Sequence, residues 1–231
     1  MADMKVKQGI HIDRNPIESF LMRVKDFAKK NKRQVLIFFA FVTFASVLII
    51  SIFLYLENFS TKNLVKYELI VENYRQNPLD ETVKKQTIDD LNLIIENTSF
   101  GFAPKAANYI LGNIYFEDKK FEESYNHFQA YVQKTSLNDA LHPIALNKAA
   151  IALEEQGRID EALSILIKYE EKAKDSIVMD QVLYNIGRLY ALSGDRLKAR
   201  DYYNRLMLAY PDSSFADRAK ERLFLLSVQQ G

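Results

Sequence analysis

Histidines are the side chains in this sequence best suited to acid–base or metal chemistry, and there are three of them. His11, His127 and His142 lie far apart along the chain, and none belongs to a His-Glu-x-x-His motif. The chain has no cysteine, which removes thiol nucleophiles and disulfides. Its seven glycines form no phosphate-binding loop of the G-x-G-x-x-G or G-x-x-x-x-G-K kind. We therefore expect no catalytic residues, no metal site and no cofactor, and we expect that the protein is not an enzyme.

An uninterrupted apolar run, residues 35–56, is the element with the clearest physical meaning. It contains 22 residues and no charge. As a helix it would be about 33 Å long, enough to cross a hydrocarbon core of about 30 Å. The alternative is a cleaved secretory signal, whose apolar region has about 7–15 residues and ends in a small-x-small site. Leu54 and Leu56 do not suit such a site, so we predict a single transmembrane helix.

The charges beside this run predict its orientation. Residues 1–34 hold nine Lys or Arg, whereas residues 57–72 hold only Lys62 and Lys66. The positive-inside rule then makes residues 1–34 a basic cytoplasmic tail and places residues 57–231 across the membrane. The inverted orientation remains the alternative. The nine basic residues of the tail are Lys5, Lys7, Arg14, Arg23, Lys25, Lys29, Lys30, Lys32 and Arg33.

Within the tail, residues 16–29 carry apolar side chains at helical spacing, which predicts a short amphipathic helix. This helix could lie on the lipid surface or dock on a cytoplasmic partner, and the sequence leaves both open. Of the 31 basic and 30 acidic residues, nine and four precede the apolar run, which leaves 22 and 26 in residues 57–231. The net charge of −4 argues against a nucleic-acid partner for this part of the chain.

Residues 57–231 show a helical pattern with internal repeats. Three small residues, Gly112, Ala150 and Gly187, are separated by 38 and 37 residues. Each copy continues with a small residue and an aromatic or aliphatic residue further on, and the third copy, which starts with the segment IGRLY at 186–190, also ends in a proline. This pattern resembles the tetratricopeptide repeat, which has about 34 residues per copy. The third copy carries the motif through Gly194, Ala199, Tyr203, Leu206 and Pro211.

The resemblance implies an all-α fold, in which the transmembrane helix precedes a tetratricopeptide-type α-solenoid of about three to four helix pairs plus a capping helix. Small residues allow the two helices of a pair to cross closely, and we expect Tyr115, Phe128, Tyr190 and Tyr203 to fill the gap to the next repeat. The expected segments are a degenerate pair at 60–96, repeats at about 105–134, 142–172 and 180–211, and a cap at 213–228. Gly157 and Gly194 suit helix ends that need a positive φ.

In the tetratricopeptide family, the first helix of each pair lines a concave groove that holds protein ligands. Carried over to this sequence, the groove positions are Tyr109, Asn113, Phe116, Asn147, Ile151, Tyr184 and Arg188. The alternative is that Phe116 and Ile151 only pack between helices while the others face solvent. Arg188 is the one basic residue in this set, which favours an apolar partner over a C-terminal carboxylate.

The layout as a whole resembles the YfgM-like family of ancillary subunits of the SecYEG translocon. That resemblance implies a single-pass protein of the bacterial inner membrane with a periplasmic domain, and protein partners: translocon subunits, a membrane-bound periplasmic chaperone and exported polypeptides. Two functions follow as hypotheses. One is a chaperone-like adaptor that binds exported chains, and the other is a scaffold that tethers or oligomerises the envelope machinery, with self-association left open.

Overall fold

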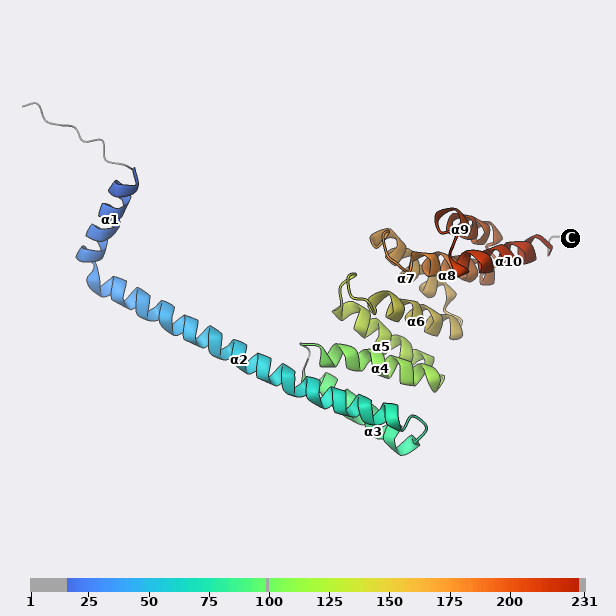
Figure 1. The fold of residues 1–231 in the computed structure, drawn as a ribbon, viewed down its shortest axis with the longest axis horizontal. Helices are drawn as coiled ribbons and strands as arrows, with labels where there is room; N and C mark the ends of the chain where they lie inside the picture. The colour runs from blue at the N-terminus through green and yellow to red at the C-terminus, as the bar shows by residue number, and fades with distance from the viewer. Residues whose placement is uncertain (1–15, 99, 229–231) are drawn as a thin grey trace, which may run out of the picture. The chain divides into compact units, whose positions relative to one another are not determined.

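The computed structural model describes residues 16–98 and 100–228, and every helix or strand assigned within them is an α-helix. The predicted all-α fold is therefore confirmed. Its helices (Figure 1) are α1 (Pro16–Lys30), α2 (Lys32–Gln76), α3 (Glu81–Asn97), α4 (Ala103–Glu117), α5 (Phe121–Lys134), α6 (His142–Glu155), α7 (Ile159–Lys172), α8 (Met179–Leu192), α9 (Arg196–Ala209) and α10 (Ser214–Val228). His11 and the predicted tail residues Lys5, Lys7 and Arg14 lie outside the described residues. The chain divides into two compact units, Met1–Asn58 and Phe59–Gly231.

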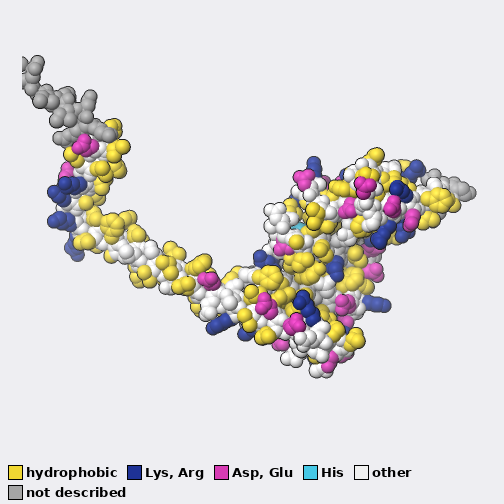
Figure 2. Space-filling view, viewed as in Figure 1, with side chains coloured by type: hydrophobic (Ala, Val, Ile, Leu, Met, Phe, Trp, Pro, Cys, Tyr) yellow, Lys and Arg dark blue, Asp and Glu magenta, His cyan; other side chains and the backbone are white. Residues whose placement is uncertain are grey.

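The described part of the first unit consists of α1 and the beginning of α2. In the apolar run, residues 35–56, no side chain is buried. Figure 2 shows hydrophobic side chains over this segment and Lys and Arg side chains beside its start. Among the described helices, α2 is the one that is long and apolar enough to cross a membrane.

The course of α2 differs from the sequence interpretation, which expected a separate helix from residue 60. The helix instead continues without a break from Lys32 to Gln76. The reason is local, because residues 57–60 contain no glycine or proline that would end a helix. The end at Gln76 also has a local cause, since Pro78 disfavours the helical conformation of Asn77.

The second unit is a stack of helices in which each helix from α3 to α10 packs against the next one (Figure 1). Short connections make consecutive helices antiparallel. At the start of the stack, Val71 of α2, Leu91 and Ile94 of α3, and Leu111 of α4 form one apolar cluster. A larger cluster runs from α6 to α10, and α10 packs on α8 as well as on α9. The stack therefore continues beyond the third predicted repeat through α10.

Small residues at the helix crossings are confirmed by the packing. A Cβ atom on Gly112 would lie 2.8 Å from the Phe128 ring, and one on Gly187 would lie 2.8 Å from the Tyr203 ring. In the second repeat, where alanine stands at position 150, the residue 16 positions later is Leu166 and not an aromatic. The pairings indicate that glycine is needed where the facing side chain is a ring, whereas alanine suffices opposite leucine.

The four aromatics expected to reach the next repeat also pack inside their own pair, where Phe128 and Tyr203 face the glycines described above. Tyr115 stacks on His127 with ring centroids 5.3 Å apart, and Tyr190 stacks on Tyr202 at 5.6 Å. Both stacked tyrosines lie near the C-terminal ends of α4 and α8. There the following helix of the same pair, which starts after a short turn, is the nearest surface.

The turns inside the pairs require a residue in the left-handed region. Gly157 has φ +74° and Gly194 has φ +86°, as expected from the sequence. The first pair has Lys119 at this place, with φ +58°. A side chain in this conformation costs about 1–2 kcal/mol relative to glycine.

Replacing Lys119 with glycine is therefore expected to stabilise the protein. The gain in the free energy of unfolding should be about 0.5–1 kcal/mol, because the extra freedom of glycine in the unfolded chain offsets part of the relieved strain. Urea unfolding followed by circular dichroism would measure it. Gly157→Ala is the matched control and should lose stability, and a loss of stability in Lys119→Gly would contradict the argument.

His142, at the start of α6, leads us to expect that the protein loses stability in acid. Burial lowers the pKa of His142 below its usual value, although the nearby Asp139 carboxylate acts in the opposite direction. The ring stacks on Tyr169, and its Nδ1 lies 3.0 Å from the Thr135 hydroxyl. With a lowered folded-state pKa, the neutral ring stabilises the fold above the unfolded pKa of about 6.5, and this contribution is lost as the pH falls through the folded value.

We therefore expect the melting temperature to fall between about pH 7 and about pH 5.5. His127 contributes in the same direction, because burial also lowers its pKa while Glu123 opposes the shift. A double variant with His127→Gln and His142→Gln should show a smaller change over this range. An equal change in the variant and the parent would assign the acid sensitivity to other groups.

Candidate protein-binding surface

A ladder of polar contacts joins each helix pair to the next. In the described residues, these contacts connect side chains that are 33 to 38 positions apart, close to one repeat period. The pairs are Lys84–Asp118, Lys148–Asn113, Arg158–Glu122, Asn185–Asn147, Arg188–Glu154, Arg205–Glu170 and Ser213–Asp180. Successive pairs are thus held in register by hydrogen bonds as well as by apolar packing.

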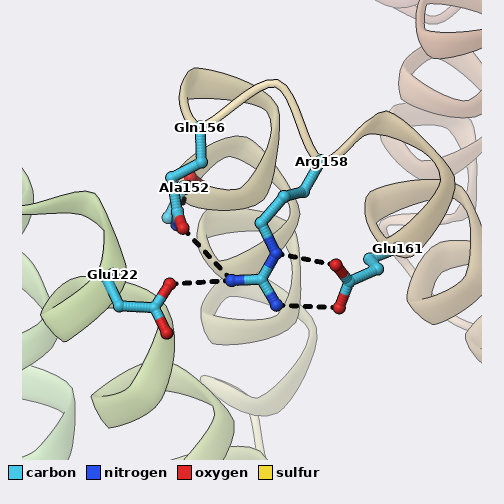
Figure 3. A network of polar contacts seen from close by, with 5 residues as sticks. All are labelled: Glu122, Ala152, Gln156, Arg158 and Glu161. Carbon is cyan, nitrogen blue, oxygen red and sulfur yellow. Dashed lines mark hydrogen bonds and ion pairs between the residues drawn. The ribbon is translucent and has the colours of Figure 1, made fainter.

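Arg158 shows how one side chain fixes this register (Figure 3). Its Nη1 donates to Glu122 Oε2 of the preceding pair at 2.7 Å and to Gln156 Oε1 at 3.1 Å. Its Nε and Nη2 donate to both carboxylate oxygens of Glu161 at 2.7 and 2.8 Å. The turn between α6 and α7 is therefore bound to the start of α5. Because the two glutamates are more than half exposed, solvent screens each ion pair and its contribution to stability is small.

The predicted groove residues of the first repeat lie on α4 and are half-buried. Tyr109 packs against the rings of Phe128 and Tyr131, with centroids 5.9 and 5.4 Å away. Asn113 donates to the Tyr109 carbonyl at 2.7 Å and accepts a hydrogen bond from Lys148. Phe116 packs edge to face on Phe121 at 5.4 Å. All three contact neighbouring helices and keep only part of their surface for a ligand.

The predicted groove residues of the second and third repeats are less accessible. Asn147 and Tyr184 are buried, and Asn147 accepts a hydrogen bond from Asn185 Nδ2 at 2.6 Å. Ile151 is half-buried on α6. Arg188 donates two hydrogen bonds to the Glu154 carboxylate. The polar groups of Asn113, Asn147 and Arg188 are thus used between repeats.

A hollow on this face lies between α8 and α10. A groove of about 250 Å³ is lined there by Arg188, Leu192, Tyr203, Arg222, Leu225 and Leu226, with Ala191 beside them. The sequence interpretation missed Arg222 and Leu225 because it treated the last helix only as a cap. A usable signal was present, since Arg222 follows Arg188 by 34 residues and Arg188 follows Glu154 by the same interval.

The groove combines apolar walls with hydrogen-bond donors. Leu192 and Leu225 are exposed at its rim. Arg222 also lines the groove, and a hydrogen bond with Tyr184 raises its pKa. Tyr203 is fully buried, its hydroxyl has no hydrogen-bond partner among the described residues, and burial raises its pKa to about 12. Such a surface suits an aliphatic side chain of a protein ligand beside a hydrogen-bond acceptor.

Comparison with known proteins agrees with this architecture. Residues 181–213, which correspond to α8, α9 and the start of the following turn, match the tetratricopeptide repeat family. The chain is 27% identical over 133 residues to a TPR repeat-containing protein of Treponema pallidum (strain Nichols), and the match covers 57% of this chain and 54% of that protein. The chain therefore spans about half the length of this curated relative.

Two solved structures share the fold at low identity. One is a crystal structure of a Podosopora anserina kinesin light chain with nearly identical TPR-like repeats, which has a TM-score of 0.55 and 12% identity and covers 74% of this chain and 89% of that one. A variant of the same protein gives a TM-score of 0.56 at 12% identity, over 74% of this chain and 88% of that one. None of these proteins is described as a translocon subunit.

Proposed function

Because this chain is an all-α repeat protein of the tetratricopeptide type, we propose that it is a membrane-anchored protein-binding module. The observation that carries the proposal is the groove between α8 and α10, which offers apolar walls and the Arg222 guanidinium to a protein ligand. Repeat stacks of this kind present such surfaces without catalytic chemistry. The domain then acts by binding and positioning other proteins.

The anchor in this proposal is the apolar part of α2, residues 35–56. It spans the bilayer, the basic tail before it lies in the cytoplasm, and the repeat stack lies across the membrane. The uniformly exposed apolar surface of this segment supports the anchor, because a helix that is apolar all round must be covered by lipid or protein. α1 lies on the cytoplasmic lipid surface, and its apolar face is the basis for that placement.

The finer proposal is a chaperone-like adaptor at the protein-export translocon of a bacterial inner membrane. Its partners are translocon subunits, a membrane-bound periplasmic chaperone and exported polypeptides. The resemblance of the layout to YfgM-like proteins supports it, as does a groove whose rim is aliphatic. An aliphatic rim with few fixed polar contacts suits weak binding of many unfolded sequences.

The second candidate is a scaffold for the cell-envelope machinery. It is favoured by one observation: Asn113, Asn147 and Arg188 use their polar groups within the stack. A stack with few free polar groups along its concave face would bind one folded partner, or a second copy, through apolar surface. The two functions predict different sets of captured proteins.

Photocrosslinking in cells separates these functions. A photoreactive residue would replace Leu192 or Leu225 at the rim of the groove in the full-length chain, and Leu208, which is exposed on α9, would be the matched control. Translocon subunits together with many exported proteins, caught at the groove but not at position 208, would support the adaptor. One stoichiometric envelope protein, or only copies of the chain itself, would rule out the adaptor and support the scaffold.

The anchor is tested separately by extraction of membranes with alkaline carbonate. We expect the full-length protein to remain in the pellet with its N-terminal residues intact by mass spectrometry. Release into the supernatant, or a mature chain that begins after residue 56, would contradict the anchor. The groove could still bind proteins in that case, so the membrane anchor and the protein-binding groove are tested independently.

A further inference from the structure

The connections between successive helix pairs carry exposed large apolar side chains. They are Phe100 and Phe102 between α3 and α4, Leu137 and Leu141 between α5 and α6, Ile144 in the first turn of α6, and Ile177 between α7 and α8. Ile177 is 94% exposed and Phe102 is 60% exposed. We call this set the loop edge. Large apolar side chains that gather on a surface mark a candidate interaction site.

These connections lie at the same edge of the second unit. Because consecutive helices are antiparallel, every link between pairs falls on one edge, and every turn inside a pair falls on the other. A cleft of about 440 Å³ joins two of the links directly, since Leu137 and Pro143 line it from one side and Ile177 from the other. The α5–α6 and α7–α8 connections of the loop edge therefore form one continuous surface.

The first connection of the loop edge is fixed to α2 within the second unit. Phe100 packs on Phe59 with ring centroids 5.9 Å apart, and Phe102 packs on Tyr67 at 6.0 Å. Gly101, with φ +88°, allows the loop to approach Ser60 so closely that a Cβ atom would lie 2.6 Å from its hydroxyl oxygen. The α3–α4 connection is thus held against the first residues of the second unit.

Chain connectivity relates this contact to the apolar run. Phe59 follows the last residue of the run, Leu56, by three positions, and three residues span at most about 11 Å. If residues 35–56 cross a bilayer, Phe59 lies at its surface, and so does Phe100, which packs on it. Phe102 follows Phe100 by two residues and packs further along α2, on Tyr67.

We propose that the loop edge is a membrane-contacting surface that inserts its apolar side chains into the interface of the bilayer crossed by α2. The inference rests on the membrane anchor proposed above. It adds a defined side of the repeat stack that faces lipid, which leaves the turns inside the pairs directed away from the membrane. The lipid contact needs no new partner protein, because the chain itself brings this surface to the bilayer.

Since the chain has no cysteine, single cysteines can be introduced and labelled without background. The full-length protein would be reconstituted into phosphatidylcholine–phosphatidylglycerol vesicles with an environment-sensitive dye at Ile177 or Phe102. Leu197, 81% exposed at the opposite edge, is the matched control. We expect a blue-shifted emission at positions 177 and 102 that nitroxide-labelled lipid quenches by at least about twofold, and little quenching at position 197.

A second measurement introduces charged side chains into the loop edge. Ile177→Asp and Phe102→Asp together should weaken the quenching of a dye at Leu137, whereas Leu197→Asp should not change it. Ile177 and Leu197 are 94% and 81% exposed, so their substitutions should leave thermal unfolding unchanged, whereas Phe102→Asp also removes a contact with the Tyr67 ring. A cooperative thermal transition would show that the double variant folds. Equal quenching at positions 177 and 197 in vesicles that retain the protein would overturn the loop-edge proposal alone. Failure of the protein to float with the vesicles would overturn the anchor and the loop edge together.

Discussion

Replacing Gly187 with alanine should lower the free energy of unfolding by about 1–3 kcal/mol, the range found for overpacked cores. The added methyl group would lie 2.8 to 2.9 Å from two carbons of the Tyr203 ring. The ring cannot easily move, because Tyr203 is fully buried and packs on Tyr184 with centroids 5.9 Å apart. Urea unfolding of the full-length protein in detergent would measure the loss.

The second repeat indicates a substitution that should compensate for the added methyl group. Since the second repeat pairs Ala150 with Leu166, Tyr203→Leu should recover part of the stability of Gly187→Ala. A double-mutant cycle should therefore give a coupling energy of at least about 1 kcal/mol between positions 187 and 203. Additive effects would show that the glycine serves another purpose. Tyr203→Phe is the control for the ring alone and should be neutral or slightly stabilising, because the hydroxyl has no hydrogen-bond partner among the described residues.

Truncation of the ion pair between Arg188 and Glu154 has the other large expected effect. The two side chains are 24% and 16% exposed, and they join the second helix pair to the third. Burial disfavours the charged form of Arg188, but its hydrogen bonds with Glu154 outweigh this and raise its pKa. Glu154→Ala would leave the guanidinium without its partner in this environment, and Arg188→Ala would do the same to the carboxylate. Each change should cost about 2–3 kcal/mol, somewhat less than for a fully buried pair.

The measurement is again urea unfolding, with Lys198→Ala as the control. Lys198 pairs with Asp195 at 3.0 Å, but its side chain is 59% exposed and screened by solvent, so its loss should cost far less stability than the loss of Arg188 or Glu154. A combined Glu154→Gln and Arg188→Met variant should be more stable than either alanine variant, because no unpaired charge remains. If Arg188→Ala unfolds like the parent protein, the pair does not stabilise the stack and Arg188 would be free for a ligand.

The stability of the contact between Arg188 and Glu154 also affects how binding experiments are interpreted. In a repeat stack, stability is the sum of the pairs and of the contacts between neighbours, so a weakened contact between the second and third pairs would loosen the C-terminal part that forms the groove. Loss of binding in an Arg188 variant would then have two explanations. Substitutions at Leu192 and Leu225, which are exposed, test the groove without that ambiguity.

Features that depend on neighbours along the chain could be predicted from the amino-acid sequence alone. The apolar run, the proline at the start of α4 and the glycines at positions 157 and 194 act within one helix or one turn. The small residues at 112, 150 and 187 were recognisable because they recur at one face with a fixed period. Local conformation and helix faces are encoded in such short spacings.

The tertiary structure was needed to show which side chains of different repeats meet. It buried Asn147 and Tyr184, paired Arg188 with Glu154 and placed Arg222 beside the same groove. The physical reason is that these contacts depend on how far each pair is shifted and turned relative to the next, which is set by the packing of whole helix faces. Residues about 34 positions apart have no local interaction that could fix this offset. The repeat pattern therefore predicts which residues can form contacts between pairs, and the packing of the helices determines which of these contacts form.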